Sequence, residues 1–461
     1  MSSLINRIPI TFIRSSGILF MALIYLVYFF LPLDLLFWVF IFFLGLSLLF
    51  GVYYLNKASK ILCASMLVMG HVIFFFYGGT ADMWLESLTK NMPLVTFLVF
   101  IPLLSIPFRV EGHFKVIQEV AVGRLEGRQR FYSFVSFLTF SICIIMNMGG
   151  LRLNYEMLED HFRRYTQTGV QALMRGYAAS MLWGPYFPTV ILILYYLNLP
   201  SYMYLGPALM FGLLSLGFLM LYGWMVYRKQ VIIENQIPSI PFPISNSAKR
   251  KLIVFIFLVL LLIILSLALE SWVGLPIMIA MSVISIVFPL VMVTLTKQKI
   301  AYIAAVRDYR IQILPKMINE VSLFLSAGFL GEMIANTNFG QVLPSLFTTL
   351  GSVSLWLMIF LLMIIIPLLA IVGVHPLVTG SVLGTSLSPA AVGLNPVSLA
   401  GTLIAGWAMA LVLSPVSAIN VIVGGMVDKP PYVVGLKWNW LYSFCWALFL
   451  TCVFYVYHHL F

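Results

Sequence analysis

Long apolar runs separated by short polar loops repeat along the chain from Ile10 to its last residues. A helix needs about 20 mostly apolar residues to cross roughly 30 Å of hydrocarbon. The runs predict transmembrane helices near residues 10–31, 33–54, 61–79, 93–108, 176–198, 205–227, 251–268, 272–296, 318–340, 397–427 and 438–459. Two more runs, 131–150 and 351–373, do not fit simple crossings, and we interpret the segments 131–175 and 351–396 as re-entrant hairpins. The predicted fold is an all-α polytopic membrane protein with about eleven transmembrane helices and these two hairpins.

The placement of Lys and Arg supports this interpretation. If the N-terminus is cytoplasmic and each hairpin returns to the side from which it enters, the outside keeps little more than Lys90. Cytoplasmic loops of membrane proteins carry such an excess of positive charge. The inside loops are then 55–60, 109–130, 228–250, 297–317 and 428–437. We therefore expect a multi-pass protein of the plasma (cytoplasmic) membrane, with the C-terminus outside.

The composition agrees with lipid as the main solvent. Hydrophobic residues make up 62% of the chain and charged residues 9%, whereas a soluble domain has roughly 25% charged residues. The basic loops explain the net charge of +11, so we expect contact with membrane lipid and none with nucleic acid. The four cysteines show no metal-ligand spacing and no ATP-binding P-loop occurs, so we expect no metal, no cofactor and no ATP-driven pumping.

The two halves of the chain resemble each other at an offset of 230 residues. The segments RGYAASMLWGPYFPTV (175–190) and AGWAMALVLSPVSAIN (405–420) align Gly176 with Gly406 and Pro185 with Pro415. The predicted helices in these segments cross in opposite directions, which indicates an inverted-topology repeat. We expect a first half at 1–227, a proline-rich cytoplasmic linker at 228–250 and a second half at 251–461.

Each of the aligned helices contains a polar, proline-bearing stretch near its middle, at 184–189 and at 414–420. Proline removes a backbone donor and displaces the carbonyl four residues earlier. In lipid, freed backbone groups are tolerated where protein or a water-filled cavity satisfies them, so two matching breaks favour a cavity over simple kinks. The break residues are Gly184, Pro185, Pro188 and Pro415.

This layout resembles the ion transporter superfamily, and within it the divalent anion:sodium symporters. The segment LVLSPVSAINVIVGG (411–425) is similar to the family's proline-rich break, and FLSAGFLGEMI (324–334) to the glycine-bearing helix before its second hairpin. The resemblance implies transport, with sodium or a proton as the coupling ion. The family's Ser-Asn-Thr triplet is absent from both tips, MNMGGLRLN (146–154) and GVHPLVTGSVLGTS (373–386). The resemblance therefore concerns the scaffold, and it leaves the substrate and the coupling ion open.

In this architecture the hairpin tips and the helix breaks meet near the middle of the membrane, where helix N-termini face an anion. The glycines at the tips let the backbone approach a ligand, or serve only tight turns and helix packing. The candidate substrate-binding residues are Asn147, Gly149, Gly150, Arg152, Asn154, Thr189, Thr379, Gly380, Ser381, Ser414, Ser417 and Asn420.

Three charged or titratable residues have two interpretations each. Arg152 at the first tip is either a clamp for carboxylate or phosphate or the partner of Glu156. His375 is either a proton-coupling group or a structural histidine. Glu332 is either a relay carboxylate or a helix-end residue near solvent.

We expect a secondary active transporter of a small anionic solute, working by alternating access, with a homodimer as one candidate assembly. The alternatives are a membrane-embedded enzyme of envelope synthesis, acting as a transferase on a lipid-linked substrate, and a flippase for a lipid-linked anion. The sequence contains no paired carboxylates, metal cluster or nucleophile motif at catalytic spacing, which favours transport over an enzyme.

Overall fold

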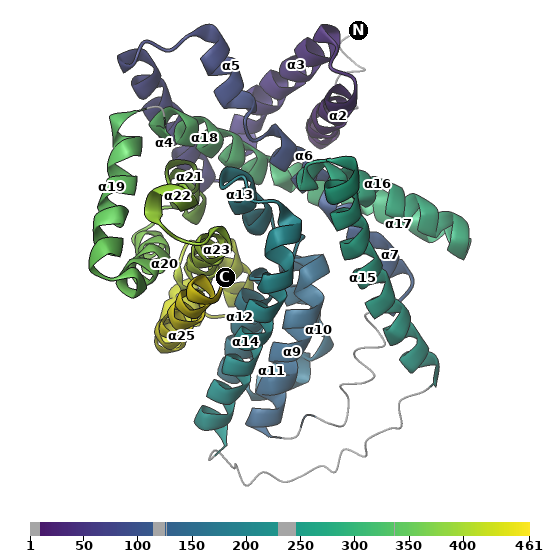
Figure 1. Cartoon of the computed structure of the whole chain (residues 1–461). Coiled ribbons are helices and arrows are strands. Elements are labelled where there is room, and N and C mark those ends of the chain that lie inside the picture. The colour runs from purple at the N-terminus through teal and green to yellow at the C-terminus, as the bar shows by residue number, and fades with distance from the viewer. Residues whose placement is uncertain (1–9, 114–124, 126, 229–245, 336) are drawn as a thin grey trace. The chain divides into compact units, whose positions relative to one another are not determined.

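The computed structural model describes residues 10–113, 125, 127–228, 246–335 and 337–461, and every regular element in these ranges is helical (Figure 1). This confirms the prediction of an all-α fold. Within the same ranges, nine helices are long and apolar enough to cross a membrane by length and composition, and three shorter apolar helices accompany them. Residues 128–146, predicted as a hairpin leg, are among the nine, whereas the predicted helix at 176–198 is interrupted and is not.

The chain divides into two compact units, and each unit takes segments from both halves of the sequence. Unit 1 comprises Met1–Glu111 and Leu265–Gln341. Its helices are α2 (Ile10–Phe30), α3 (Asp34–Gly51), α4 (Lys57–Phe76), α5 (Ala81–Thr89), α6 (Met92–Phe100), α7 (Ser105–Val110), α16 (Ile277–Thr296), α17 (Lys299–Asp308) and α18 (Ile318–Ala335). Helix α18 packs on α4, and α2 packs on α3. Helices α15 (Asn246–Val273) and α19 (Asn338–Val353) each continue from one unit into the other.

Unit 2 comprises Gly112–Ile264 and Val342–Phe461, and it contains both predicted hairpins and both interrupted helices. Its first set of helices is α9 (Arg128–Met146), α10 (Met148–Met157), α11 (Glu159–Arg164), α12 (Thr166–Met181), α13 (Pro188–Tyr196) and α14 (Ser201–Tyr227). Its second set is α20 (Leu355–Ile371), α21 (Pro376–Ser386), α22 (Pro389–Val392), α23 (Pro396–Leu413), α24 (Ala418–Val427) and α25 (Trp438–Leu460). The predicted linker 228–250 lies mostly outside the described residues.

The two sets of helices in unit 2 pack in the same pattern. Helix α9 lies along α12 as α20 lies along α23, and α14 contacts α9 as α25 contacts α20. A Cβ atom placed on Gly176 of α12 would lie 2.6 Å from the carbonyl oxygen of Ser136 in α9. A Cβ atom placed on Gly406 of α23 would lie 2.5 Å from the carbonyl oxygen of Met363 in α20. The two glycines that the offset of 230 residues aligns therefore let two corresponding helix pairs approach closely.

Both aligned helices are interrupted where the prolines lie. Helix α12 ends at Met181 and α13 begins at Pro188, while α23 ends at Leu413 and α24 begins at Ala418. Helix α12 also begins ten residues earlier than predicted from the apolar run, at Thr166 rather than at 176. Its first turns are polar but mostly buried within unit 2, so hydropathy alone placed its start too late.

Candidate functional site

The first hairpin turns at Asn147, between α9 and α10. Asn147 has a φ of 49° and a ψ of −132°, a positive-φ conformation outside the left-handed helical region, which residues other than glycine rarely adopt. Its Oδ1 accepts a hydrogen bond from the hydroxyl of Tyr177 in α12. This bond ties the hairpin turn to the helix that precedes the first break.

Asn154, on α10, is fully buried. Its Nδ2 donates to Thr139 Oγ1 at 3.0 Å, and the Thr139 hydroxyl in turn donates to the carbonyl oxygen of Val135 at 2.7 Å. Because the Thr139 hydroxyl already donates to Val135, it can only accept from Asn154. The Nδ2 of Asn154 therefore faces Thr139, and the Oδ1 of Asn154 points away from it. Among the described residues, Asn154 Oδ1 has no hydrogen-bond partner. A buried acceptor without a partner costs free energy unless a ligand, water or ion supplies one.

The second hairpin contributes Thr379, Gly380 and Ser381 from α21, all of them buried. Ser381 Oγ accepts a hydrogen bond of 3.3 Å from the hydroxyl of Tyr196, on α13. Within the described ranges, the hydroxyl of Thr379 has no partner. A Cβ atom on Gly380 would lie 2.4 Å from the Trp407 ring, so this glycine permits close packing of α21 on α23.

Asn420 holds the second break together. Its Nδ2 donates to the carbonyl oxygens of Val412 at 2.8 Å and Ser414 at 2.7 Å, at the end of α23. The Ser414 oxygen also accepts from the backbone nitrogen of Ser417 at 3.1 Å. Ser417 caps α24: its Oγ accepts from the backbone nitrogen of Asn420 at 3.2 Å. The Ser414 hydroxyl donates to Ala370 O at 2.7 Å. Asn420 Oδ1 is buried and, in the part of the chain that the structure describes, without a partner.

The first break, around Gly184 and Pro185, is stabilised in a different way. The hydroxyl of Tyr204 donates to the carbonyl oxygen of Leu182 at 2.9 Å, so a tyrosine serves the role that Asn420 serves in the second break. Helix α13 then begins at Pro188, and Thr189 is buried in its first turn. A proline at the first position of a helix is favourable because its missing N–H would have no helical partner.

The hairpins and breaks come together in crossed pairs within unit 2. Helix α10 of the first hairpin packs on α24, which follows the second break, and α21 of the second hairpin packs on α13, which follows the first. The helices that carry most of the predicted residues therefore meet at two corresponding contacts. Helix α10, which carries Asn154, meets α24, which carries Asn420 behind its cap Ser417. Helix α21, which carries Thr379, Gly380 and Ser381, meets α13, which carries Thr189.

Other predicted residues have different surroundings. Gly149 is exposed, and Gly150 packs on Cys143 of α9. The Arg152 side chain is 74% exposed and its Nε donates to Glu156 Oε1 at 2.7 Å, which is the pairing that the sequence offered as the alternative to an anion clamp. Glu332 lies in unit 1, where its carboxylate is 3.3 Å from the ammonium group of Lys90.

His375 occupies the N-cap of α21. Its Nδ1 accepts a hydrogen bond of 3.2 Å from the backbone nitrogen of Leu377, as capping side chains do.

We predict that His375→Asn, which keeps a capping acceptor, retains the stability of the wild type, and that His375→Ala loses about 1 kcal/mol. Thermal unfolding and the pH profile of transport check this together. A His375→Asn protein that folds normally but transports without the pH dependence of the wild type would show a proton-coupling role instead.

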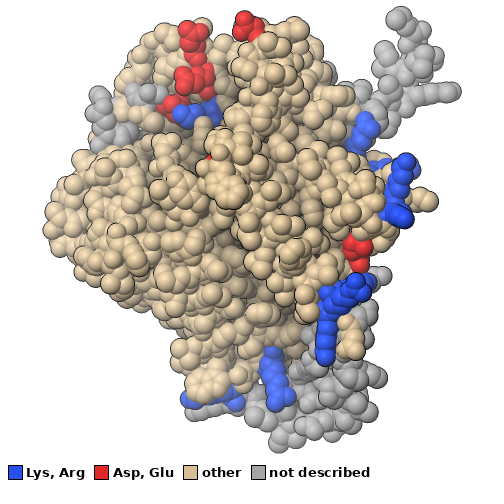
Figure 2. Space-filling view, turned by 45° about the vertical axis from the view of Figure 1, so that its right-hand side comes forward, with Lys and Arg blue, Asp and Glu red and all other residues tan. Residues whose placement is uncertain are grey.

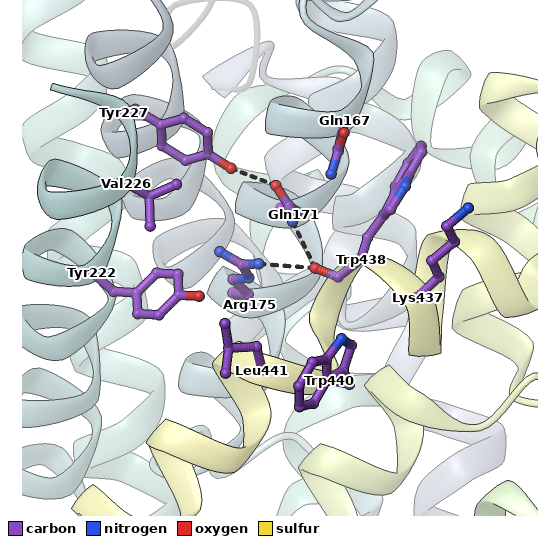
Figure 3. Close-up of a pocket in the computed structure, with 10 residues that line it drawn as sticks. All are labelled: Gln167, Gln171, Arg175, Tyr222, Val226, Tyr227, Lys437, Trp438, Trp440 and Leu441. Carbon is purple, nitrogen blue, oxygen red and sulfur yellow. Dashed lines mark hydrogen bonds between the residues drawn. The ribbon is translucent and has the colours of Figure 1, made fainter. Parts of the chain in front are cut away.

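A second polar site, which the sequence did not predict, surrounds Arg175 in α12 (Figure 3). The side chain is 2% exposed. Its Nε donates to Asn439 Oδ1 at 2.9 Å, and its terminal nitrogens donate to the Tyr132 hydroxyl at 3.2 Å and to Trp438 O at 3.1 Å. The rings of Tyr222 and Tyr442 lie 5.2 and 4.5 Å from the guanidinium carbon, within the range of cation–π interactions.

Arg175 lines a pocket of about 220 Å³ at the junction of α12, α14 and α25. The other residues that line it are Gln167, Gln171, Tyr222, Val226, Tyr227, Lys437, Trp438, Trp440 and Leu441. Gln171 accepts from the Tyr227 hydroxyl and donates to Trp438 O, as the dashed lines of Figure 3 show. The sequence did contain a signal: Thr168, Gln171 and Arg175 follow helical spacing, and they form a polar stripe in a segment of otherwise small and apolar residues.

Charged side chains are sparse on the molecular surface (Figure 2). Most of the face in that view is uncharged, and the Lys and Arg side chains gather in a few groups near its edges. This is the distribution expected of a chain whose sides contact lipid and whose charges lie in loops and at helix ends.

No family model matches the chain, and no curated protein matches it either. The solved structures do include similar folds. The structure of the YdaH transporter of Alcanivorax borkumensis, described there as having an unusual topology, matches with a TM-score of 0.57. The match covers 87% of this chain and 98% of that one, at 13% sequence identity. This likeness shows that the chain has a transporter-like fold, and together with the apolar helices it identifies an all-α polytopic membrane protein.

Proposed function

We propose that the protein is a secondary active transporter of a small anionic solute, working by alternating access with a coupled cation. The observation that carries the proposal is the crossed packing of each hairpin helix on the helix that follows the other half's break. In transporters built from inverted repeats, substrate and coupling ions bind where interrupted helices meet. The fold similarity to a transporter structure supports the same function, although a fold alone does not determine function.

The chemistry at the crossed contacts suits an anion together with a cation. Helices α10, α13, α21 and α24 form these contacts, and helix N-termini present N–H groups and a partial positive charge to an anion. The buried oxygens Asn154 Oδ1, Asn420 Oδ1 and Thr379 Oγ1 can instead accept from a solute donor or coordinate a hard cation. Sodium fits these neutral oxygens, whereas a proton would require His375 or Glu332 as its carrier.

We propose the cytoplasmic membrane as the location, with the N-terminus in the cytoplasm and the C-terminus outside, because this orientation places the basic loops inside. Membrane lipid is then the main partner, and a homodimer is one candidate assembly.

An exchange assay tests the proposal. We expect proteoliposomes loaded with an unlabelled anion to take up the same labelled anion faster than empty liposomes, for at least one member of a panel of carboxylates, phosphates and sulfonates. Sodium, proton and anion gradients imposed in turn identify the coupling ion. If no anion moves under any of these gradients, the proposal fails.

The same preparation separates transport from the alternative of a transferase. A transporter returns the labelled solute chemically unchanged, and mass spectrometry of the recovered solute and lipid checks this. A covalently modified lipid without solute exchange would support the enzyme instead.

A further inference from the structure

The buried guanidinium of Arg175 lies in unit 2, on α12 at the end of the predicted first hairpin segment. We infer that the pocket around it is a second anion site, which binds the carboxylate or phosphate of a small solute or of a lipid headgroup. Arg175 is seven residues before Leu182, where α12 has ended, so it lies about 10 Å along the helix from the first break. The inference goes beyond the proposed function, because this site can bind an anion whether or not the chain transports one.

The charge of Arg175 has no acidic partner in the part of unit 2 that the structure describes. Arginine keeps its positive charge in proteins, and a buried unpaired charge is costly. The acidic residues described in this unit are Glu156, Glu159, Asp160 and Asp428, of which the first two pair with exposed arginines. The hydrogen-bond partners of Arg175 are a neutral amide, a hydroxyl and a carbonyl. A bound anion would supply the missing negative charge.

Counting donors indicates how the anion would bind. A guanidinium has five N–H groups, and the hydrogen bonds of Arg175 use one on Nε and one on each terminal nitrogen. One N–H remains on each terminal nitrogen. Each of these N–H groups can donate to an oxygen of a carboxylate or phosphate, ions that arginine commonly recognises.

The neighbouring helix ends hold the guanidinium in place. Asn439 accepts from Arg175 through Oδ1 and donates through Nδ2 to Val434 O at 2.8 Å. Val434 lies in a π-helical turn, Val433–Lys437, directly before α25. Such turns are rare and frequently occur at functional sites. The Arg175 side chain is therefore fixed at one wall of the pocket before any ligand binds, and it loses little conformational entropy on binding.

Other residues in and beside the pocket add positive charge near Arg175. Lys437 lies at the exposed rim, and no acidic residue lines the pocket. A neighbouring pocket of about 260 Å³ shares Gln167, Gln171, Val226 and Tyr227 with the first and adds Arg128 and Arg164. The first pocket, at about 220 Å³, is smaller than the roughly 300–1,000 Å³ typical of sites for drug-sized ligands. Its size therefore suits a small anion or one headgroup.

Thermal unfolding of the full chain in detergent tests the site. We expect sodium phosphate or sodium acetate to raise the unfolding midpoint above that in sodium chloride at the same ionic strength, and the rise to grow with anion concentration. Arg175→Lys keeps the positive charge but removes the planar guanidinium, and it should weaken the apparent affinity for the anion by about 10-fold. Arg175→Gln also removes the charge and should weaken this affinity by about 100-fold. Lys437→Met, at an exposed position that tolerates substitution, should weaken it by about 3-fold even if the Arg175 variants fail to fold.

The matched control is Arg163→Gln. Arg163 is exposed and paired with Glu159, so this variant removes one positive charge from unit 2 without touching the pocket. Its apparent affinity should equal that of the wild type.

A second arm identifies the source of the anion. The wild type and the Lys437→Met variant are placed in nanodiscs of phosphatidylcholine, with and without phosphatidylglycerol. Stabilisation by free phosphate or acetate indicates a soluble anion, and stabilisation by phosphatidylglycerol alone indicates a lipid headgroup. The inference is overturned if neither stabilises the wild type, or if the stabilisation is equally large in the Arg175 and Lys437 variants. Arg175 would then serve only to hold α12 to α25.

Discussion

Alanine at Gly406 should destabilise unit 2 by about 2–3 kcal/mol, and alanine at Gly176 by a similar amount. The added Cβ atoms would lie 2.5 Å from Met363 O and 2.6 Å from Ser136 O. Because both obstacles are backbone oxygens, the helices themselves must move apart, and the cost cannot be relieved by a side-chain rotation. We expect the apparent unfolding midpoint in detergent to fall by roughly 5–10 °C in each variant.

Gly217→Ala is the matched control. Gly217 lies inside α14, and a Cβ atom there meets nothing within 4 Å. Since alanine favours a helix over glycine by about 1 kcal/mol, this variant should equal or exceed the wild type in stability. The same unfolding midpoint in all three variants would contradict the close packing of α12 on α9 and of α23 on α20.

Asn420→Asp should be the most damaging conservative change at the second break. The Asn420 Nδ2 donates to two carbonyl oxygens at 2.7 and 2.8 Å, and aspartate would replace this donor with a negatively charged acceptor. The Ser414 oxygen would keep its bond from the backbone nitrogen of Ser417, but the Val412 oxygen would lose the Asn420 donor and both would face a carboxylate. This change should cost about 3–5 kcal/mol. The measurement is the unfolding midpoint of the purified protein, followed by its rate of anion exchange.

Asn198→Asp makes the same substitution at an exposed residue after α13. Its stability should stay within about 1 kcal/mol of the wild type, because Asp tolerates the φ of 51° at this position and a negative charge after a helix C-terminus costs up to about 1 kcal/mol. An Asn420→Asp protein as stable as Asn198→Asp would contradict the role given to Asn420 as the donor that satisfies the second break.

Much of the helical layout could be predicted from hydropathy and proline. The apolar runs place α14 and α25 within a few residues of their observed ends. The prolines place both interruptions, because proline limits helix geometry wherever it occurs. The offset of 230 residues even paired Gly176 with Gly406, whose packing roles proved equivalent.

Other features depend on contacts between distant segments, which hydropathy cannot show. Arg175 is buried because Asn439 and Trp438, more than 260 residues later, provide its acceptors. The choice between pairing and clamping for Arg152 depended on the exposure of its side chain. The division into two compact units likewise follows from packing, since each unit draws on both halves of the sequence.

Uphill accumulation tests the central claim most directly. Proteoliposomes are prepared with equal concentrations of the exchanged anion on both sides, and a gradient of the coupling cation is then imposed. The account predicts that the internal anion concentration rises above the external one, and that it falls back when an ionophore collapses the cation gradient. An anion that only equilibrates across the membrane, with or without the gradient, would contradict secondary active transport.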